Sequence, residues 1–348
     1  MKGLILCAGK GTRIRPLTYS QPKTLLPVAG KPVLSYCIEQ LIESGIRDIG
    51  IVIHPSQKDA MDRYREGCER RDEVSITYIE QVEPRGIADA VRVAEPFLER
   101  DPFLLLLGDN LIEESVTRLR KQLEEEKVAG AIMLAEVSEP REYGIAEIRG
   151  KRIVSLEEKP AAPKSNLAVI GAYAFQPEIW TAVNEIRPSP RGEYEITDVI
   201  QWLIDHAFDI SYYVTKRHYS DVGTVSRWLE ANRWKLDQET GGKNAIASDA
   251  QIDNCTFIPP VKIGKGCQLK HAVLGPYVTV SPQSKIENCR IKDSVVLEGS
   301  RLLSIPQTVE KSVFGRFVQV NGCFTQTQTG VFVLGDQSTV MFAGGEWR

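Results

Sequence analysis

Leu4-Ile5-Leu6-Cys7-Ala8-Gly9-Lys10-Gly11-Thr12-Arg13 begins as an apolar run and ends in a glycine-rich, basic turn. The run from Leu4 to Ala8 is long enough for a buried strand. Gly9 and Gly11 would let backbone N–H groups approach an anion without a Cβ in the way, and Arg13 adds positive charge. Because ligands of open α/β sheets bind at the carboxyl ends of the strands, the stretch predicts a phosphate-binding turn at one edge of a sheet.

The spacing of these glycines excludes two commoner phosphate loops. A P-loop needs a glycine, four residues and then Gly-Lys-Ser/Thr, whereas Lys10 is followed by Gly11 and no glycine stands at the required upstream position. The dinucleotide-binding fingerprint needs a third glycine where this chain has Ile14. The spacing therefore favours neither a P-loop kinase nor a dehydrogenase.

The pattern of short apolar runs and longer amphipathic segments continues to about residue 238. It predicts an α/β domain over residues 1–238 with a mostly parallel, Rossmann-like sheet. A helix is expected from Val33 with its end at Gly45, and two later helices are expected to be capped by Thr197 and Thr224. The further expected strands are 49–53, 76–80, 103–107 and 131–137.

Residues 239–348 follow a different pattern, in which single aliphatic residues recur every five or six positions. The pattern predicts a hexapeptide-repeat β-helix rather than an irregular β tail, because one rung cannot bury its own aliphatic residue and stacked rungs can share a core. The expected core positions are Ile246, Ile252, Ile258, Ile263, Leu269, Leu274, Val280, Ile286, Ile291, Val296 and Leu302. Gly264, Gly266, Gly275 and Pro282 are expected at the corners.

Composition narrows the classes of partner. The formal net charge of −3 gives no broad basic field for binding nucleic acid. The 7 cysteines form no CxxC pair, which excludes a zinc knuckle or a disulfide framework and fits a reducing compartment. No apolar run approaches the roughly 18 residues that a membrane-spanning helix needs. We therefore expect a cytoplasmic protein that binds neither membrane nor nucleic acid.

Further motifs follow the opening turn in order. They are Arg15-Pro16-Leu17-Thr18, Pro22-Lys23-Thr24-Leu25-Leu26-Pro27, Gln81 to Ala88, Leu107 to Asn110, Glu142-Tyr143-Gly144, Glu157 to Pro160, Arg191 to Asp198 and Asp221 to Thr224. This series closely resembles the sugar nucleotidyltransferases, also called sugar nucleotide pyrophosphorylases, and the repeats resemble the left-handed β-helix of the family's long form. The resemblance implies an enzyme that joins a nucleoside triphosphate to a hexose 1-phosphate and releases pyrophosphate.

The resemblance also implies the roles of individual residues. The catalytic residues would be Arg13, Lys23, Asp109, Lys159 and Asp221. Of these, Asp109 and Asp221 would bind Mg²⁺, for which carboxylate oxygens are suitable ligands. The nucleotide would be bound by Leu6, Ala8, Gly9, Gly11, Thr12, Arg13, Gln81, Gly86 and Asp109. The sugar phosphate would be bound by Asn110, Tyr143, Gly144, Glu158, Lys159, Val169, Tyr173 and Arg191.

The sequence Arg85-Gly86-Ile87-Ala88 favours the thymidylyl branch of this family, with dTTP and glucose 1-phosphate as substrates. UTP remains an alternative, because a single methyl group in an apolar pocket gives only about 1 to 3 kcal/mol of discrimination. A non-catalytic relative that binds nucleotide-sugars and regulates an enzyme is a second alternative. For the β-helix we expect a role in assembly or regulation, and hence a homo-oligomer.

Overall fold

The structure, a computed structural model, describes residues 1–68, 70–150, 152–305, 307–322 and 329–342. By their contacts these residues form two compact units, neither of which is continuous in the sequence. The first unit contains Met1–Gly9 and Val33–Ser220, and the second contains Lys10–Pro32 and Asp221–Arg348. The opening glycine turn is therefore divided after Gly9, and the residues that follow it pack with the carboxyl-terminal part of the chain.

The first unit is built on a mixed sheet with the strand order β10-β9-β11-β6-β1-β4-β5, and β8 joins β11 to β12. Strands β6, β1, β4 and β5 are mutually parallel neighbours, whereas β11 runs antiparallel to β6, β8 and β9. The strands of this unit are β1 (Lys2–Leu6), β4 (Asp48–Ile53), β5 (Ser75–Glu80), β6 (Phe103–Leu107), β7 (Asn110–Ile112), β8 (Gly130–Glu136), β9 (Gly144–Arg149), β10 (Arg152–Glu158), β11 (Leu167–Phe175), β12 (Ile210–Thr215) and, at the boundary, β13 (Tyr219–Asp221).

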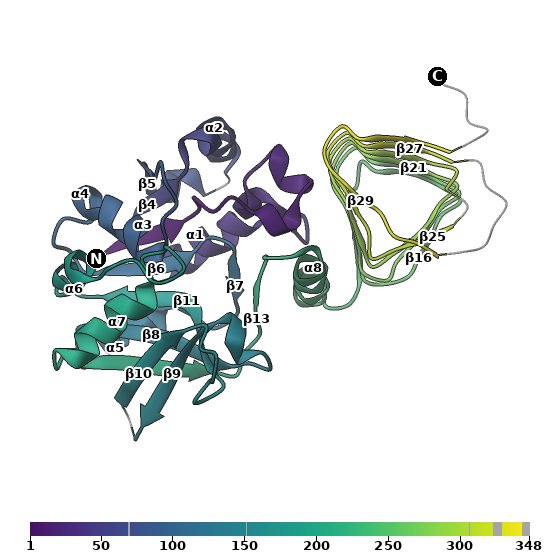
Figure 1. The fold of residues 1–348 in the computed structure, drawn as a ribbon. Coiled ribbons are helices and arrows are strands. Elements are labelled where there is room, and N and C mark those ends of the chain that lie inside the picture. Colours follow the sequence, from purple (N-terminus) through teal and green to yellow (C-terminus); the bar gives the residue numbers. More distant parts are fainter. Residues whose placement is uncertain (69, 151, 306, 323–328, 343–348) are drawn as a thin grey trace. The chain divides into compact units, whose positions relative to one another are not determined.

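Helices flank this sheet (Figure 1). They are α1 (Val33–Glu43), α2 (Lys58–Gly67), α3 (Ile87–Val93), α4 (Glu95–Leu98), α5 (Thr117–Glu125), α6 (Ile179–Glu185) and α7 (Ile196–Asp205). Short 3-10 helices lie at Pro55–Gln57, Arg71–Glu73 and Pro140–Glu142. In the described part of the chain, no helix has the length and apolar character that crossing a membrane requires.

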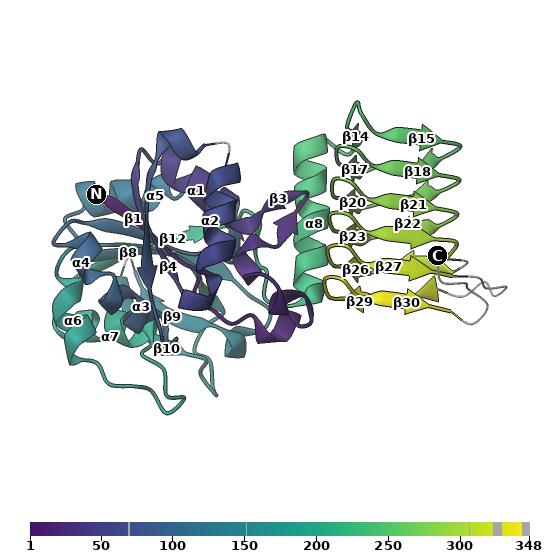
Figure 2. The ribbon, with the colours of Figure 1, turned by 90° about the horizontal axis from the view of Figure 1, so that it is seen from above.

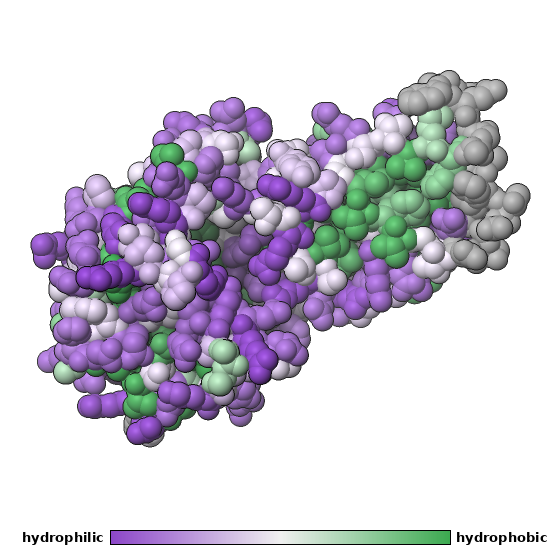
Figure 3. Space-filling model, viewed as in Figure 1, coloured by the Kyte–Doolittle hydropathy of each residue, from purple (hydrophilic) through white to green (hydrophobic). Residues whose placement is uncertain are grey.

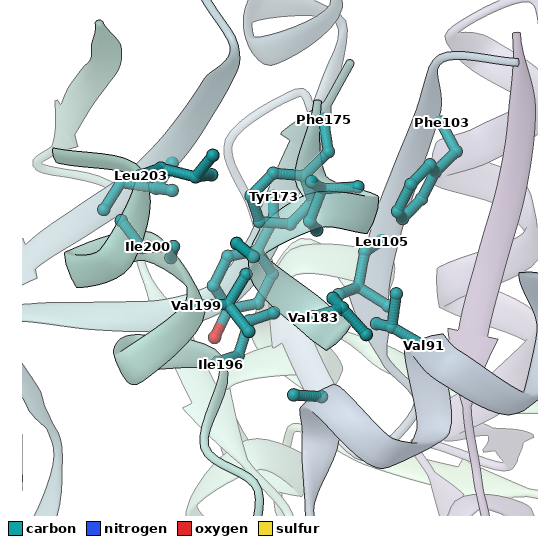
Figure 4. Packing of buried hydrophobic residues seen from close by; sticks show 14 of the residues in the cluster. Val91, Phe103, Leu105, Tyr173, Phe175, Val183, Ile196, Val199, Ile200 and Leu203 are labelled. Atoms are coloured by element: carbon teal, nitrogen blue, oxygen red, sulfur yellow. The ribbon is translucent and has the colours of Figure 1, made fainter. Parts of the chain in front are cut away.

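The core of the first unit lies between the sheet and α3, α6 and α7. Phe103 stacks on Trp180 with ring centroids 6.1 Å apart, and Phe175 lies 5.8 Å from Phe103. Figure 4 shows Tyr173 among these side chains, with its hydroxyl pointing toward Ile196 at the start of α7. The all-apolar strand β6 is buried on both faces, as expected for a central strand.

Most of the expected elements of this unit are confirmed with small shifts. Strand β6 has the expected bounds, whereas β1 begins and ends two residues earlier than Leu4 and Ala8. Gly45 ends the first helix region with a φ of +80°, a conformation that favours glycine. The expectation that Thr197 caps a helix is wrong. Helix α7 begins at Ile196, and Thr197 is a buried helical residue whose hydroxyl faces Glu158 at 3.4 Å.

The second unit contains helix α8 (Val225–Thr240) and a parallel β-helix with three sheets (Figures 1 and 2). One sheet contains β14 (Asn244–Ile246), β17 (Val261–Ile263), β20 (Val278–Val280), β23 (Ser294–Val296), β26 (Val313–Phe314) and β29 (Val333–Leu334). The second contains β15 (Gln251–Asp253), β18 (Gln268–Lys270), β21 (Lys285–Glu287), β24 (Arg301–Leu303), β27 (Gln319–Asn321) and β30 (Thr339–Met341). The third contains β16 (Thr256–Phe257), β19 (Val273–Leu274), β22 (Arg290–Lys292), β25 (Thr308–Glu310) and β28 (Thr329–Gly330).

The repeats form the core of this β-helix as expected. Leu269, Ile286 and Leu302 lie one above the other in neighbouring rungs and are all buried. The predicted fold class, an α/β nucleotidyltransferase-type domain followed by a hexapeptide-repeat β-helix, is therefore confirmed. Cys267 and Cys289 are buried in this core, which agrees with a packing role, while Cys323 lies outside the described residues.

The two ends of the β-helix differ from its middle. The expectation of a buried core position is wrong for Ile246, Ile252 and Ile258, which are 38%, 43% and 44% exposed. They belong to the first rung, so rungs stack on one side of them only. At the other end, Figure 3 shows hydrophobic side chains over the last rung, where Val331 is 65% exposed.

Helix α8 begins as predicted, because Oγ1 of Thr224 accepts a hydrogen bond of 3.3 Å from the backbone N of Arg227. The helix runs along the stacked rungs (Figure 2). Residues 10–32 pack in the same unit and contain the strands β2 (Pro27–Val28) and β3 (Lys31–Pro32). They also contain 3-10 helices at Thr12–Ile14, Leu17–Tyr19 and Lys23–Leu25.

The corner glycines of the β-helix yield a stability prediction. Gly275 has a φ of +110°, and a Cβ there would overlap the backbone carbonyl of Ile258 in the preceding rung. Gly241, after α8, also has a positive φ, but nothing lies within 4 Å of its missing Cβ. We expect Gly275→Ala to lower the free energy of unfolding by about 3 kcal/mol and Gly241→Ala by only about 1 kcal/mol. Urea unfolding followed by circular dichroism measures both, and equal losses would contradict the packing described here.

Candidate active site

The parallel strands β1 and β6 end side by side at one edge of the sheet. Leu6 pairs with Leu107, and the backbone N of Gly108 donates a 2.9 Å hydrogen bond to the carbonyl of Leu6. A Cβ on Gly108 would lie 2.6 Å from Sγ of Cys7, so no larger residue fits there without a shift. The predicted nucleotide-binding residues Leu6, Ala8 and Gly9 therefore lie close in space to Gly108, directly before the predicted metal ligand Asp109.

Cys7 itself is a packed residue, as its position between a buried strand and a turn suggests. It is 2% exposed, its backbone N donates to the carbonyl of Val52, and its carbonyl accepts from Nε2 of Gln57 at 3.1 Å. The thiol of Cys37 is buried nearby, and burial together with the charges of Cys7 and Asp109 raises the pKa of Cys37 well above its ordinary value. The Cys37 thiol is therefore held in its protonated form, and Cys7 is packed in the interior.

Asn110 contacts an irregular part of strand β11. Its Nδ2 donates to the carbonyl of Ile170 at 3.0 Å, in a bulge where the pairing of β11 with β8 shifts between Val169 and Tyr173. Gly171 in this bulge has a φ of +74°, and Nδ2 of Asn110 occupies the place of its missing Cβ. Asn110 thus contacts the bulge that separates Val169 and Tyr173, two further residues that were predicted to bind the sugar phosphate.

Gln81 follows strand β5 and is almost fully buried, with 3% of its surface exposed. Its Nε2 donates to Oδ2 of Asp89 at 2.8 Å and lies 3.4 Å from the carbonyl of Gly86. Asp89 is itself 2% exposed and accepts from Nη2 of Arg85 at 3.1 Å. Asp89 was not predicted, because it lies in α3 whereas Arg85 precedes that helix, so no helical spacing joins them.

Gly86 is required by a close contact between two segments of backbone. It has a φ of +111°, and a Cβ there would lie 2.5 Å from the carbonyl oxygen of Tyr194. The backbone N of Tyr194 donates to Arg85 at 2.7 Å, and the backbone N of Ala88 donates to Tyr194 at 3.0 Å. The Gln81–Ala88 motif and the Arg191–Asp198 motif are thus joined by their main chains, a contact that neither motif predicts by itself.

Glu158 is the centre of a polar cluster at the end of strand β10. Its Oε1 lies 3.4 Å from Nη1 of Arg191 and 4.0 Å from Nζ of Lys159, and its Oε2 accepts from Thr197 at 3.4 Å. Burial raises the pKa of Glu158 above its ordinary value, and the charges of Lys159 and Arg191 oppose this shift in part. Burial and the charge of Glu158 also raise the pKa of Tyr173.

Gly144 faces this cluster from the neighbouring strand, where it pairs with Glu158. A Cβ on Gly144 would lie 3.0 Å from Oε2 of Glu158 and 2.5 Å from Cγ2 of Thr197. Lys159 has a φ of +44°, in the left-handed region, and its backbone N donates to the carbonyl of Tyr143 at 2.9 Å. The predicted sugar-phosphate residues Tyr143, Gly144, Glu158, Lys159 and Arg191 therefore gather in one place.

The remaining predicted residues belong to the second unit. Gly11 has a φ of +60°, and a Cβ there would lie 2.9 Å from Cγ2 of Thr18 and 3.2 Å from Cβ of Lys23. Thr12 and Arg13 follow in a 3-10 helix. The glycine turn and Lys23 are therefore close together, as a shared role in binding phosphates requires.

Asp221 lies near Arg13 around Gly223. A Cβ on Gly223 would lie 2.6 Å from Oδ1 of Asp221 and 3.2 Å from Nη2 of Arg13. Asp221 also forms an ion pair with Arg227, whose Nη1 lies 2.8 Å from Oδ2 and 3.1 Å from Oδ1. Arg227 was not predicted, because the pair joins the residue before a turn to the first turn of α8.

These contacts divide the predicted catalytic residues into two groups. Asp109 and Lys159 belong to the first unit, and Arg13, Lys23 and Asp221 belong to the second.

Within the described residues, no group of three or more His, Cys, Asp or Glu side chains is arranged to hold a metal ion. A site made by protein side chains alone, such as a zinc centre, is therefore not seen in that part of the chain.

Several known proteins are similar to this chain. The glucose-1-phosphate thymidylyltransferase of Streptomyces griseus is 35% identical over 352 residues, which cover 97% of this chain and 98% of that protein. The enzyme of the same name from Streptomyces antibioticus is 37% identical and covers 98% of this chain and 99% of its own. The UTP–glucose-1-phosphate uridylyltransferase AglF of Haloferax volcanii is 37% identical over 243 residues, or 69% of this chain and 98% of its own.

A solved structure resembles the chain as well. The crystal structure of a Bacillus anthracis protein described as a glucose-1-phosphate thymidylyltransferase, in complex with sucrose, superposes with a TM-score of 0.63 and 32% identity. The match covers 67% of this chain and 94% of the Bacillus chain. The nucleotidyl transferase family matches residues 2–238, the part that holds all the predicted site residues. This chain therefore belongs to the nucleotidyl transferase family.

Proposed function

We propose that the protein transfers the thymidylyl group of dTTP to glucose 1-phosphate and releases dTDP-glucose and pyrophosphate. The observation that carries this proposal is the cluster at Glu158, in which a partly buried carboxylate lies near two cations and a glycine. A hexose 1-phosphate has hydroxyl groups for the carboxylate and a phosphate for the cations. The names of the two Streptomyces relatives support the same pair of substrates.

In the proposed reaction a phosphate oxygen of glucose 1-phosphate attacks the α-phosphorus of dTTP. A new bond forms between that oxygen and the α-phosphorus, and the bond from the α-phosphorus to the bridging oxygen of the β-phosphate breaks. The attacking phosphate is already an anion near neutral pH, so the step needs no general base. The protein then has two tasks, which are to align the two phosphates in line and to neutralise their charge.

Each task has candidate residues. We propose that the backbone at Gly9 and Gly11, with the Arg13 guanidinium, binds the β- and γ-phosphates that leave as pyrophosphate. Lys23 would neutralise charge at the α-phosphate, for which a compact ammonium group is suited. Lys159 and Arg191 would hold the phosphate of the sugar. The ionised Glu158 would accept hydrogen bonds from sugar hydroxyls, while Gly144 keeps side-chain atoms away from the ring.

Asp109 and Asp221 are the residues that would hold Mg²⁺. Hard oxygen ligands suit this ion, which in proteins is usually bound by one or two carboxylates together with substrate phosphates and water. The carboxylates of Asp109 and Asp221 are ligands of this kind. When held by these residues, the ion would supply positive charge that stabilises the negative charge developing on the phosphates. Arg227 neutralises Asp221 in the structure, so we expect it to turn away or to share the carboxylate when a cation binds.

The base would be recognised at Gln81. Because both contacts of its amide use Nε2, we propose that Oε1 accepts a hydrogen bond from the N3–H of a pyrimidine. Asp89 and Arg85 would fix the amide in this orientation. Thymine and uracil share N3–H, so this contact distinguishes pyrimidines from purines but does not separate dTTP from UTP.

A panel of nucleoside triphosphates tests the proposal directly. With Mg²⁺ and glucose 1-phosphate, we expect pyrophosphate release to be fastest with dTTP, slower with UTP by no more than about 100-fold, and negligible with ATP and GTP. Asp109→Asn should lower kcat at least about 100-fold with dTTP, whereas Asp72→Asn, on an exposed side chain, should leave it unchanged. Faster turnover with UTP would favour the uridylyl alternative, and no turnover with any triphosphate would overturn the proposed activity.

The environment of Glu158 predicts a pH effect. Arg191 lowers the pKa of Glu158, so Arg191→Gln should raise that pKa further above its ordinary value. If the ionised carboxylate binds the sugar, kcat/KM for glucose 1-phosphate is lost as pH falls through this pKa. The acid limb of the pH profile should therefore move to higher pH in Arg191→Gln.

The phosphate of the substrate titrates in the same way in assays of every variant, so it does not account for a shift of the acid limb between variants. Arg187→Gln, in the same loop, controls for the loss of a nearby positive charge. Its profile should match that of the unmodified protein. An acid limb in Arg191→Gln that stays in place, or that moves to lower pH, would show that Glu158 does not act as an ionised acceptor.

A further inference from the structure

Residues 10–32, which contain Arg13 and Lys23, contact helix α8 and the β-helix. These contacts, and not only those within residues 10–32, hold the segment in the second unit. The central contact is Asn232 on α8, which is 1% exposed. Its Oδ1 accepts a 2.9 Å hydrogen bond from the backbone N of Ala29 and a second, also of 2.9 Å, from Oγ1 of Thr279. Thr279 lies in strand β20 of the β-helix and is likewise 1% exposed. One buried oxygen thus joins the loop, the helix and the β-helix.

Ala29 has a backbone conformation that is unfavourable for alanine. Strands β2 and β3 form a hairpin in which Val28 pairs with Lys31, and the two residues of its turn, Ala29 and Gly30, have φ values of +48° and +79°. A two-residue hairpin turn with both φ angles positive favours Asn-Gly or Gly-Gly, and alanine is unfavourable in this region. A hydrogen bond to the backbone N of Ala29 holds the turn at its least favourable residue.

A second residue of α8 holds the same hairpin. Nε1 of the fully buried Trp228 donates a 2.8 Å hydrogen bond to the carbonyl of Pro27. Trp228 and Asn232 are four residues apart and therefore lie on one face of the helix. This face of α8 binds both ends of β2, shortly after Lys23 in the sequence.

The other end of the loop contacts the last rungs of the β-helix. Oγ of Ser20 donates to Oδ2 of Asp336 at 2.7 Å, and Oδ1 of Asp336 accepts from the backbone N of Arg316 at 2.7 Å. A Cβ on Gly335 would lie 3.2 Å from the carbonyl oxygen of Pro16. Lys23 thus lies between two attachments to the same β-helix, at Ser20 and at Ala29.

Helix α8 is joined to the β-helix independently of the loop. Arg233 forms a bidentate ion pair with Asp293, and Nζ of Lys262 lies 2.9 Å from Oε2 of Glu239. Because these pairs do not involve residues 10–32, loss of the Asn232 contact should leave α8 docked. The effect of such a loss should therefore appear in the loop.

We propose that Asn232, supported by Thr279, is a positioning residue through which the β-helix sets the place of Arg13 and Lys23. The β-helix then has a role in the reaction chemistry of the protein besides any part in assembly. The catalytic part of this inference rests on the proposed function, in which Arg13 and Lys23 bind the nucleoside triphosphate. The mechanical part, the attachment of the loop, does not depend on that function.

The first test compares two neighbouring residues of α8 in the full-length protein. Asn232→Leu removes the shared acceptor, whereas Arg233→Leu breaks a pair between α8 and the β-helix without touching the loop. We expect Asn232→Leu to raise KM for dTTP about tenfold, the loss that one well-made hydrogen bond gives, with KM for glucose 1-phosphate changed less than about twofold. Arg233→Leu should lower the melting temperature without changing the ratio of the two KM values.

Two further variants keep the test decisive if Asn232→Leu does not fold. Thr279→Val removes only the hydroxyl behind Asn232 and should raise KM for dTTP by about threefold. Asn232→Asp keeps a side-chain acceptor and should restore part of the affinity that Asn232→Leu loses. An Asn232→Leu or Thr279→Val protein in which both KM values rise together would overturn the positioning role.

Hydrogen exchange separates this inference from the proposed function. In the protein without substrate, backbone amides of residues 21–32 should exchange at least about tenfold faster in Asn232→Leu than in the unmodified protein, and at an unchanged rate in Arg233→Leu. If exchange is unchanged in Asn232→Leu, the attachment itself is refuted, whatever the substrate. If exchange rises but no triphosphate is turned over by the unmodified protein, the proposed function has failed and the attachment stands.

Discussion

Strand β1 pairs in parallel with β6, with Leu6 opposite Leu107, and the chemistry proposed for this protein depends on that register. Parallel strands end at the same edge of a sheet, so the pairing brings the turn at Gly9 and the segment Gly108-Asp109 together. The close approach leaves no room for a side chain on Gly108, which explains why glycine stands there. A shift of one residue in this register would turn Asp109 to the opposite face of the sheet. The buried, all-apolar strand β6 prevents such a shift, because each of its side chains fills part of the core.

After Gly9 the chain continues from this edge of the sheet into the second unit. Residues 10–32 leave the sheet after Gly9 and pack on α8 and the β-helix, where Asn232, Trp228 and Asp336 hold them. The appended β-helix is thus part of the support of a functional loop. This would give a physical reason for a nucleotidyl transferase to keep a long β-helix, since the rungs at Thr279 and Asp336 support different ends of the loop.

The sequence pattern predicted those elements of the fold that depend on residues close together in the chain. The bounds of β6, the cap of α8 at Thr224 and the aliphatic ladder of the β-helix all follow from periodicity, capping chemistry and repeat spacing. Thr197 was wrongly expected to be a cap, because its hydroxyl faces the partly buried Glu158 instead of the helix amides. The first-rung isoleucines were expected to be buried because the repeat pattern does not show where the stack ends.

The sequence was less informative about contacts between distant segments. Motif resemblance named Glu158, Lys159 and Arg191, and the structure brings them together. It did not reveal that Asp89 holds Gln81, that Tyr194 requires a glycine at position 86, or that Arg227 pairs with Asp221. The contact of Gly86 with Tyr194 joins two segments that are distant in the sequence. The other two pairs join a residue at or just after the end of a strand to the first residues of the next helix, and no spacing rule for helices or strands encodes them.

The proposed reaction requires that Asp109 and Asp221 hold a divalent cation on a triphosphate bound at the glycine turn, and this remains our proposal. A crystal structure of the complex with dTTP and Mn²⁺, with the ion located by its anomalous signal, tests this claim most directly. We expect an anomalous peak within about 2.2 Å of a carboxylate oxygen of each aspartate and of an α-phosphate oxygen. A peak bound by neither aspartate, or a triphosphate bound away from residues 9–13, would contradict it.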